Sequence, residues 1–276
     1  MNQNKIEFTS SSKAVLIPYL LDNSYDKPFI LVIPGGGYDH YGKKEQDTIC
    51  EFFNSKGFSS ALLLYTLAPF KFPDALIDLA QCVAYIREKS NEWKIDEHKL
   101  ILCGFSAGGH LSASLGCFWN SPLLKNIRLN GKNLLPQDIR PDGLCLCYPV
   151  ISSDKKICHE KSILRLTENL SEEECKFLCD KTETKGSLLP KELIRDVVSL
   201  EKHVSKDFPK TFMWHTVQDK AVPAENTIEF AKALKEKNID FEYHLFAEGE
   251  HGLSLAKGTS TESWTDLFIN FSKKIN

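Results

Sequence analysis

The fold is decided by the stretch Lys99-Leu-Ile-Leu-Cys-Gly-Phe-Ser106-Ala-Gly-Gly-His110. It reads as a short apolar strand, a turn carrying Gly104-x-Ser106-x-Gly108, and the start of a helix. That context is typical of a nucleophilic serine on a tight turn, because the positions two before and two after the serine have no room for side chains. We therefore predict that Ser106 sits at the end of a strand with its hydroxyl exposed to a cavity. The alternative is a glycine-rich loop without chemistry.

Composition places the chain among ordinary globular proteins, with 276 residues, 42% hydrophobic and 26% charged. The formal net charge is −3 and no long basic run occurs, so we expect no binding to nucleic acid or to a membrane surface. No apolar run has the length needed to span a bilayer. The N-terminal residues show no apolar leader core, and this predicts a cytoplasmic protein.

Apolar runs bounded by turn residues alternate with stretches of helical periodicity along the whole chain. This pattern predicts an α/β fold with a mostly parallel central sheet covered by helices on both faces. Expected strands lie at residues 14–21, 29–33, 60–65, 99–105, 143–151, 210–217 and 241–246, and Pro18 suggests an edge or an irregularity in the first. Expected helices lie at about 43–56, from Pro73, after Ser106, from Pro223 to about 238, and around 264–271.

Residues 152–207 break the alternation because they are rich in charge and poor in strand signals. Ser171-Glu-Glu-Glu174 resembles the start of a helix with an acidic first turn. We predict that this segment is a mostly helical cap inserted over the end of the sheet. The chain is then one domain, 1–276, with the cap at 152–207 inside it.

Three polar residues follow predicted strands in the order serine, aspartate, histidine. A serine hydroxyl needs a positioned base, which a third group orients. The carboxyl ends of parallel strands meet at one edge of a sheet, so residues that follow them can be brought together. The order and the placement predict a triad of Ser106, Asp219 and His251.

Other histidines and acids fit the triad less well. Asp154 follows the preceding strand and is the alternative acid if Asp219 points away from His251. The remaining rivals are expected in structural roles: His110 in packing or hydrogen bonding, His215 and His244 within strands, and Asp74 and Asp78 as surface charges on a helix.

An oxyanion that develops during acyl transfer needs N–H donors aimed at it. The amide of Ala107, directly after the serine, is one predicted donor. The others are expected from Gly35-Gly-Gly37 on the loop after an early strand, where glycines let the backbone approach a substrate closely. A plain turn would use the same glycines. A phosphate loop is disfavoured because G-x-G-x-x-G and the P-loop lysine are absent.

Nine cysteines, most of them in apolar segments, predict buried free thiols in a reducing compartment. Cys145 and Cys147 lie on one predicted strand, and we expect their side chains to face opposite ways. Cys175 and Cys179 would share a helical face near Cys158-His159. We predict no metal site.

The chain resembles α/β-hydrolases of the acetyl esterase group related to hormone-sensitive lipase, in the subgroup similar to acetylxylan and feruloyl esterases. The resemblance runs from about residue 29 to the C-terminus. It rests on Pro34-Gly-Gly-Gly-Tyr38, Gly104-Phe-Ser-Ala-Gly-Gly-His110, Tyr148-Pro-Val-Ile151, Trp214-His-Thr216 with Asp219 and Val222-Pro223, and Gly249-Glu-His251-Gly252. One departure is Pro34, where the lipase-like relatives have histidine.

The resemblance implies hydrolysis of short-chain, acetyl-type esters through an acyl-serine intermediate, with neither a metal nor an organic cofactor. It implies the triad given above and oxyanion donors at Gly36, Gly37 and Ala107. We expect Tyr38 and the cap to shape the substrate pocket. The expected substrate is a small-molecule ester such as an acylated sugar, and a homodimer would fit. The alternatives are an amidase or arylformamidase on the same fold, and a binding protein without catalysis.

Overall fold

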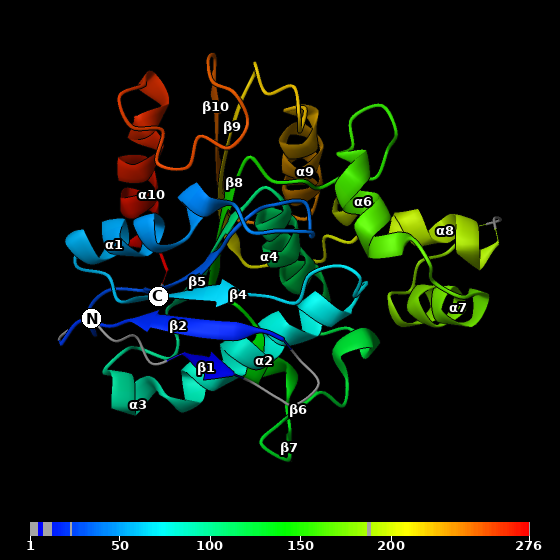
Figure 1. Ribbon diagram of the computed structural model, residues 1–276, viewed down its shortest axis with the longest axis horizontal. Helices are drawn as coiled ribbons and strands as arrows, with labels where there is room; N and C mark the ends of the chain where they lie inside the picture. The colour runs from blue at the N-terminus through cyan, green and yellow to red at the C-terminus, as the bar shows by residue number, and fades with distance from the viewer. Residues whose placement is uncertain (1–4, 8–12, 23, 187–188, 276) are drawn as a thin grey trace.

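The computed structural model describes residues 5–7, 13–22, 24–186 and 189–275. Among these residues the main sheet has eight strands. The bounds of these strands are Ile6–Glu7 (β1), Val15–Tyr19 (β2), Phe29–Ile33 (β3), Ser60–Leu64 (β4), Leu100–Phe105 (β5), Gly143–Cys147 (β8), Lys210–Thr216 (β9) and Phe241–Phe246 (β10). Their spatial order is β1-β2-β4-β3-β5-β8-β9-β10 (Figure 1).

Most of the sheet is parallel. The pairs β1–β2 and β2–β4 are antiparallel, and every pair from β4 through β3, β5, β8 and β9 to β10 is parallel. The predicted fold class, an α/β fold built on a mostly parallel sheet, is therefore confirmed. The strand β1 was not predicted, because two residues are too few to form a recognisable sequence pattern.

Helices cover both faces of the sheet (Figure 1). One face packs against α1 (Asp47–Ser55) and α10 (Trp264–Ser272), which contribute Phe53 and Phe268 to the core. The other face packs against α2 (Asp74–Glu88), α4 (Ala107–Phe118) and α9 (Glu225–Glu236). All five residues of β3 are buried because its alternate side chains enter the two cores.

Smaller elements lie between these helices and strands. A two-stranded antiparallel ribbon and two short helices occupy residues 119–141, where the sequence predicted an irregular surface excursion. The minor elements are α3 (Ser90–Trp93), η2 (Pro122–Leu124), β6 (Arg128–Leu129), β7 (Lys132–Asn133), α5 (Pro136–Ile139) and η4 (Ser260–Ser263).

The segment predicted as a cap is helical, with α6 (Glu160–Thr167), α7 (Glu172–Lys181), α8 (Pro190–Val197) and the turn η3 (Leu200–Lys202). Figure 1 shows α7 and α8 at the side of the molecule, beyond α6. The predicted start of α7 is a capping box, in which Ser171 Oγ accepts from Glu174 N at 3.2 Å and Glu174 Oε2 accepts from Ser171 N at 2.7 Å.

Two details differ from the sequence prediction. The single helix expected at 43–56 is divided into η1 (Lys43–Glu45) and α1, because the Glu45 side chain turns into the interior and Gln46 leaves helical geometry. Asp78, expected as a surface charge, is buried and accepts a hydrogen bond from Thr66 N at 2.8 Å. Among the described residues, Pro18 pairs with Ala61 of β4 and lies beyond the two positions of β2 that pair with β1.

Candidate active site

Ser106 occupies the sharp turn between β5 and α4. Its backbone has φ 52° and ψ −115°, a conformation that a non-glycine residue rarely adopts. The turn is fixed by backbone hydrogen bonds, because Ser106 N donates to Cys147 O at 3.0 Å and Ser106 O accepts from Val150 N at 3.1 Å. The predicted placement of Ser106 at the end of a strand is therefore present in the structure.

The glycines around Ser106 are required by close backbone contacts. A Cβ added to Gly104 would lie 2.3 Å from Gly108 O, and one added to Gly108 would lie 2.2 Å from Ile33 O. Such distances are far inside van der Waals contact, and the opposing atoms belong to backbone. The glycine spacing therefore lets β5, α4 and the end of β3 meet at the serine.

The structure brings the three predicted triad residues together. Ser106 Oγ lies 2.8 Å from His251 Nε2, and His251 Nδ1 lies 2.6 Å from Asp219 Oδ2. A carboxylate only accepts hydrogen bonds, so His251 carries its proton on Nδ1 and presents the Nε2 lone pair to the serine hydroxyl. This is the orientation in which a histidine can take the serine proton.

Asp219 is buried and held by more than the histidine of the triad. Its Oδ1 accepts from Ala221 N at 3.0 Å and Val222 N at 2.9 Å, and its Oδ2 also lies 3.2 Å from His215 Nε2. Burial alone would raise the pKa of Asp219. Hydrogen bonds from His215 and His251, together with electrostatic attraction from His251 and the Val222 amide, outweigh burial and hold this pKa well below its usual range.

His215 was expected in a structural role within its strand, and it is fully buried. Its Nε2 also lies 2.8 Å from Val222 O, a carbonyl that can only accept, so Nε2 carries the proton and donates toward both Val222 O and Asp219. His215 therefore helps to orient the triad carboxylate. Sequence position alone could not distinguish this contact from ordinary core packing.

The predicted oxyanion donors surround the serine. Gly36 and Gly37 line the cavity that holds Ser106 and His251, and Ala107 begins α4 directly after the serine. Among the hydrogen bonds between described residues, none uses the N–H groups of Gly36, Gly37 or Ala107. Gly36 has φ 123° and a Cβ there would lie 2.0 Å from His40 O, so only glycine fits.

A buried carboxylate that the sequence analysis did not single out lies behind this loop. Glu45 Oε2 accepts from Gly35 N at 2.8 Å, and Glu45 Oε1 accepts from Tyr148 Oη at 2.6 Å. Tyr148 Oη in turn accepts from Ser254 N at 2.9 Å, and its ring packs edge-on against His251 with centroids 5.0 Å apart. Glu45 therefore joins the glycine loop to the loop that carries His251.

Burial raises the pKa of Glu45, and the hydrogen bonds from Tyr148 and Gly35 lower it only in part. Because both carboxyl oxygens accept a hydrogen bond, the geometry matches the ionised form. The sequence signal was weak, since a glutamate at the start of a predicted helix is usually a surface residue.

Tyr38, expected to shape the substrate pocket, is buried with its hydroxyl 2.8 Å from His110 Nδ1. It does not appear among the residues that line the cavity at Ser106. Its role toward substrate therefore stays a prediction. His110 has the predicted hydrogen-bonding role, because its Nε2 lies 2.9 Å from Val198 O.

The alternative acid is not needed. Asp154 is exposed and its carboxylate accepts from Lys156 N at 3.0 Å, whereas Asp219 faces His251. His244 lies within β10 and contacts Glu242 at 2.7 Å.

The cavity at Ser106 has a volume of about 410 Å³. Two residues of the segment predicted as a cap line this cavity. They are His159 and Lys161, at the start of α6. His159 Nδ1 lies 2.8 Å from Ser162 Oγ, and burial lowers the pKa of His159, which favours a neutral ring. The segment predicted as a cap thus contributes His159 and Lys161 to the cavity lining.

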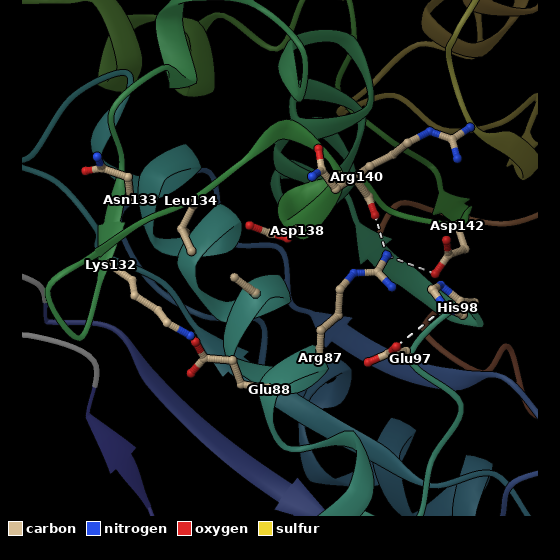
Figure 2. A pocket seen from close by; sticks show the side chains of 12 residues that line it. Arg87, Glu88, Glu97, His98, Lys132, Asn133, Leu134, Asp138, Arg140 and Asp142 are labelled. Carbon is tan, nitrogen blue, oxygen red and sulfur yellow. Dashed lines mark hydrogen bonds and ion pairs between the residues drawn. The ribbon is translucent and has the colours of Figure 1, made fainter.

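A second cavity, of about 440 Å³, is lined by the side chains drawn in Figure 2. It lies near the amino ends of β5 and β8, whereas Ser106 follows the carboxyl end of β5. Its charged side chains are partly paired: Arg87 Nη2 donates to Arg140 O at 2.5 Å and to Asp142 Oδ2 at 3.0 Å (Figure 2). No serine, threonine or cysteine lines it among the described residues. Its location and lining give it no part in the chemistry at Ser106.

One cysteine prediction is wrong. Cys145 and Cys147 face the same side of β8, with their Sγ atoms 3.9 Å apart, because strand residues two positions apart share a face. Cys103 on β5 joins them, and all three Sγ atoms lie within 4.8 Å of one another. These thiols are buried in the core against α1 and α10, away from the cavity at Ser106. The prediction of no metal site stays a prediction.

Within the described residues, no helix combines the length and the apolar character that crossing a membrane requires.

The chain is similar to endo-1,4-beta-xylanase B of Butyrivibrio fibrisolvens, with 30% identity over 91% of this chain and 36% of that protein. It is also similar to an acetylxylan esterase of Xylanibacter ruminicola, with 22% identity over 90% of this chain and 45% of that protein. The chain thus spans about a third to a half of these curated relatives.

Among solved structures, the chain is similar to an acetyl ester-xyloside bifunctional hydrolase from Caldicellulosiruptor lactoaceticus. The identity is 35%, the TM-score is 0.78, and the match covers 95% of this chain and 88% of that one. A family model named BD-FAE matches residues 18–234, which is most of the sequence. The resemblance to α/β-hydrolases of the acetylxylan esterase group is confirmed, and the chain belongs to the BD-FAE family.

Proposed function

We propose that this protein is a serine carboxylesterase that cleaves short-chain, acetyl-type esters through an acyl-serine intermediate. The observation that carries the proposal is the continuous hydrogen-bonded line from Ser106 Oγ through His251 to Asp219. The Ser106 end of this line faces a cavity lined by Gly36 and Gly37, whose N–H groups take part in no hydrogen bond between described residues. A buried, oriented acid and base beside a serine on a tight turn have the geometry needed for nucleophilic catalysis.

In the proposed first step, Ser106 Oγ attacks the ester carbonyl while His251 Nε2 takes the hydroxyl proton. The negative charge on the carbonyl oxygen is stabilised by the amides of Gly36, Gly37 and Ala107. His251 then gives the proton to the departing alcohol, and Asp219 stabilises the transient imidazolium. Water, activated by the same histidine, releases the acid and restores the serine.

The names of the relatives support a substrate class. Two of the similar proteins are described as an acetylxylan esterase and as an acetyl ester-xyloside hydrolase. We infer that the alcohol part of the substrate is an acylated sugar or a related small molecule. A cytoplasmic location, a homodimer and a role of the 152–207 segment as a cap stay predictions.

The test is reaction of the purified protein with a fluorophosphonate probe, with mapping of the labelled residue, beside turnover of 4-nitrophenyl acetate and butyrate. We expect labelling at Ser106 and faster cleavage of acetate. Ser106→Ala should lower kcat by about 10⁴-fold or more, because the nucleophile is lost. An unchanged rate in Ser106→Ala would contradict the mechanism. Faster cleavage of matched amides or N-formyl anilines would instead favour the amidase or arylformamidase alternative.

A further inference from the structure

The wall of the cavity at Ser106 carries positive charge. Lys43, Lys44 and Lys161 line it together with Ser106 and His251. The lining contains a single carboxylate among the described residues, Glu45, and both of its oxygens are occupied by Gly35 N and Tyr148 Oη. The charged groups free to meet a ligand in this cavity are therefore cationic.

The three lysines differ in how far their charge is compensated. Lys161 Nζ forms an ion pair of 2.5 Å with Asp39 Oδ2. Lys43 and Lys44 are exposed, and the ion pairs between described residues include neither of them. We call Lys43 and Lys44 the lysine rim. It is the part of the cavity wall with uncompensated positive charge.

The backbone of the lysine rim is fixed relative to the reacting groups. Glu45, the next residue, is tied to the glycine loop through Gly35 N. Lys44 O accepts from Ser254 Oγ at 2.6 Å, and Ser254 lies on the loop that follows His251. The two lysines are therefore carried by a short turn that is anchored on both sides of the site.

The charge around the rim contrasts with the charge of the whole chain, which is −3. An adjoining cavity shares Lys44 and His251 and adds Lys257 and Glu250, one charge of each sign, which leaves the excess positive. A positively charged cavity entrance on a protein of negative net charge concentrates the electric field at the site and attracts anionic ligands.

We propose that the lysine rim binds an anionic group on the ester substrate, so that the preferred substrates are esters that carry a carboxylate. This inference rests on the proposed esterase function. The carboxylate belongs either to the alcohol part, as in an acylated sugar acid, or to the acyl part, as in the half-ester of a dicarboxylic acid.

The experiment compares matched esters that differ in charge. For the alcohol side the pair is 3-acetoxybenzoate and neutral 3-acetoxybenzamide. For the acyl side the pair is mono-(4-nitrophenyl) adipate and methyl 4-nitrophenyl adipate. We expect a higher kcat/KM for the anionic member of one pair at low ionic strength, and the pair that responds identifies where the carboxylate lies.

The double variant Lys43→Gln/Lys44→Gln should lower the anionic-to-neutral ratio of kcat/KM by about three- to tenfold, as for two exposed ion pairs. Raising the salt from about 20 mM to 500 mM should lower the same ratio in the wild type. The matched control is Lys235→Gln/Lys237→Gln, which removes two exposed charges from the end of α9 and should leave the ratio unchanged.

An equal kcat/KM within both pairs, or a ratio that survives Lys43→Gln/Lys44→Gln, would overturn the proposal while the esterase function stands. If the wild type cleaves none of the four esters in a Ser106-dependent way, the esterase function itself fails and this inference falls with it. Circular dichroism of the double variant would distinguish a lost charge from a lost fold.

Discussion

At the scale of single residues, the site depends on buried polar groups that do not touch the substrate themselves but hydrogen-bond to the residues around the reacting atoms. Asp219 receives hydrogen bonds from two histidines and two amides, so its carboxylate has a fixed orientation. Glu45 plays a comparable part for the glycine loop, where it holds Gly35 N. Buried carboxylates with both oxygens hydrogen-bonded keep neighbouring groups in place because few other arrangements satisfy them.

Glu45→Gln tests this positioning role. The amide oxygen can still accept from Gly35 N, but the N–H groups then face Tyr148 Oη, so the hydrogen bond that Tyr148 donates to Glu45 is reversed or lost and the buried negative charge disappears. We expect kcat to fall by about tenfold to a hundredfold with KM little changed, less than the 10²–10³-fold typical of deleting an oxyanion donor.

The measurement for Glu45→Gln is steady-state turnover of 4-nitrophenyl acetate, with the melting temperature as a check on folding. Glu51→Gln, which removes an exposed carboxylate from α1, is the matched control and should leave kcat unchanged. A folded Glu45→Gln variant with the kcat of the wild type would show that Glu45 does not position the loop.

At the scale of elements, the site is assembled where strand ends and helix starts approach one another without side chains between them. The start of α4 passes directly over the end of β3, with Gly108 at the crossing. This contact is what brings the glycine loop after β3 next to the serine after β5. Packing of backbone on backbone tolerates no added atom, because neither side can rotate away.

Gly108→Ala should therefore destabilise the fold by about 1–3 kcal/mol, the usual cost of forcing extra volume into a packed site, and should also lower kcat. Both effects follow from displacement of Ile33 O and Pro34 O, which lie 2.2 and 2.6 Å from the position that the added Cβ would take. Urea unfolding and turnover of 4-nitrophenyl acetate measure them.

Gly131→Ala provides the contrast for Gly108→Ala. Gly131 has φ 82° and no atom of the described residues within 4 Å of an added Cβ, so the variant strains the backbone but touches nothing. It should lose some stability and keep its kcat. If the two variants lose kcat equally, the crossing at Gly108 is not what positions the glycine loop.

Comparison of the predicted with the observed helices and strands shows which features the sequence could predict. The strands with continuous apolar runs and the order of Ser106, Asp219 and His251 were readable because they follow local periodicity and strand ends. The division of the helix expected at 43–56 could not be predicted, because it depends on the hydrogen bond between Glu45 and Tyr148, which are far apart in the sequence. Long-range contacts of this kind leave no local pattern.

At the scale of the whole molecule, several buried histidines make stability depend on pH. His110 is fully enclosed, and burial lowers its pKa from 6.5 to about 4, with a small opposing effect from Val198 O. Burial likewise lowers the pKa of His203. Between pH 6.5 and about 4 the unfolded chain binds protons that these folded sites do not, so the free energy of unfolding falls as the pH falls.

His110→Gln should flatten this dependence. The difference in free energy of unfolding between wild type and variant should shrink by up to about 3 kcal/mol on going from about pH 7 to about pH 4, since the wild type loses the contribution of a neutral His110 over that range. Urea titrations at several pH values measure it. A difference that is constant with pH would show that His110 does not titrate as its burial requires.

The two borders of the main sheet have a consequence for self-association. On one side, the described residues of β1 are two, and Pro18 removes a donor from β2 beyond the two positions that pair with them. Short edges and proline resist the addition of a foreign strand. On the other side, β10 has six residues and pairs with β9 alone among the described strands. A dimer built by continuing the sheet would therefore join two copies through β10, with its two-fold axis beside Phe241–Phe246.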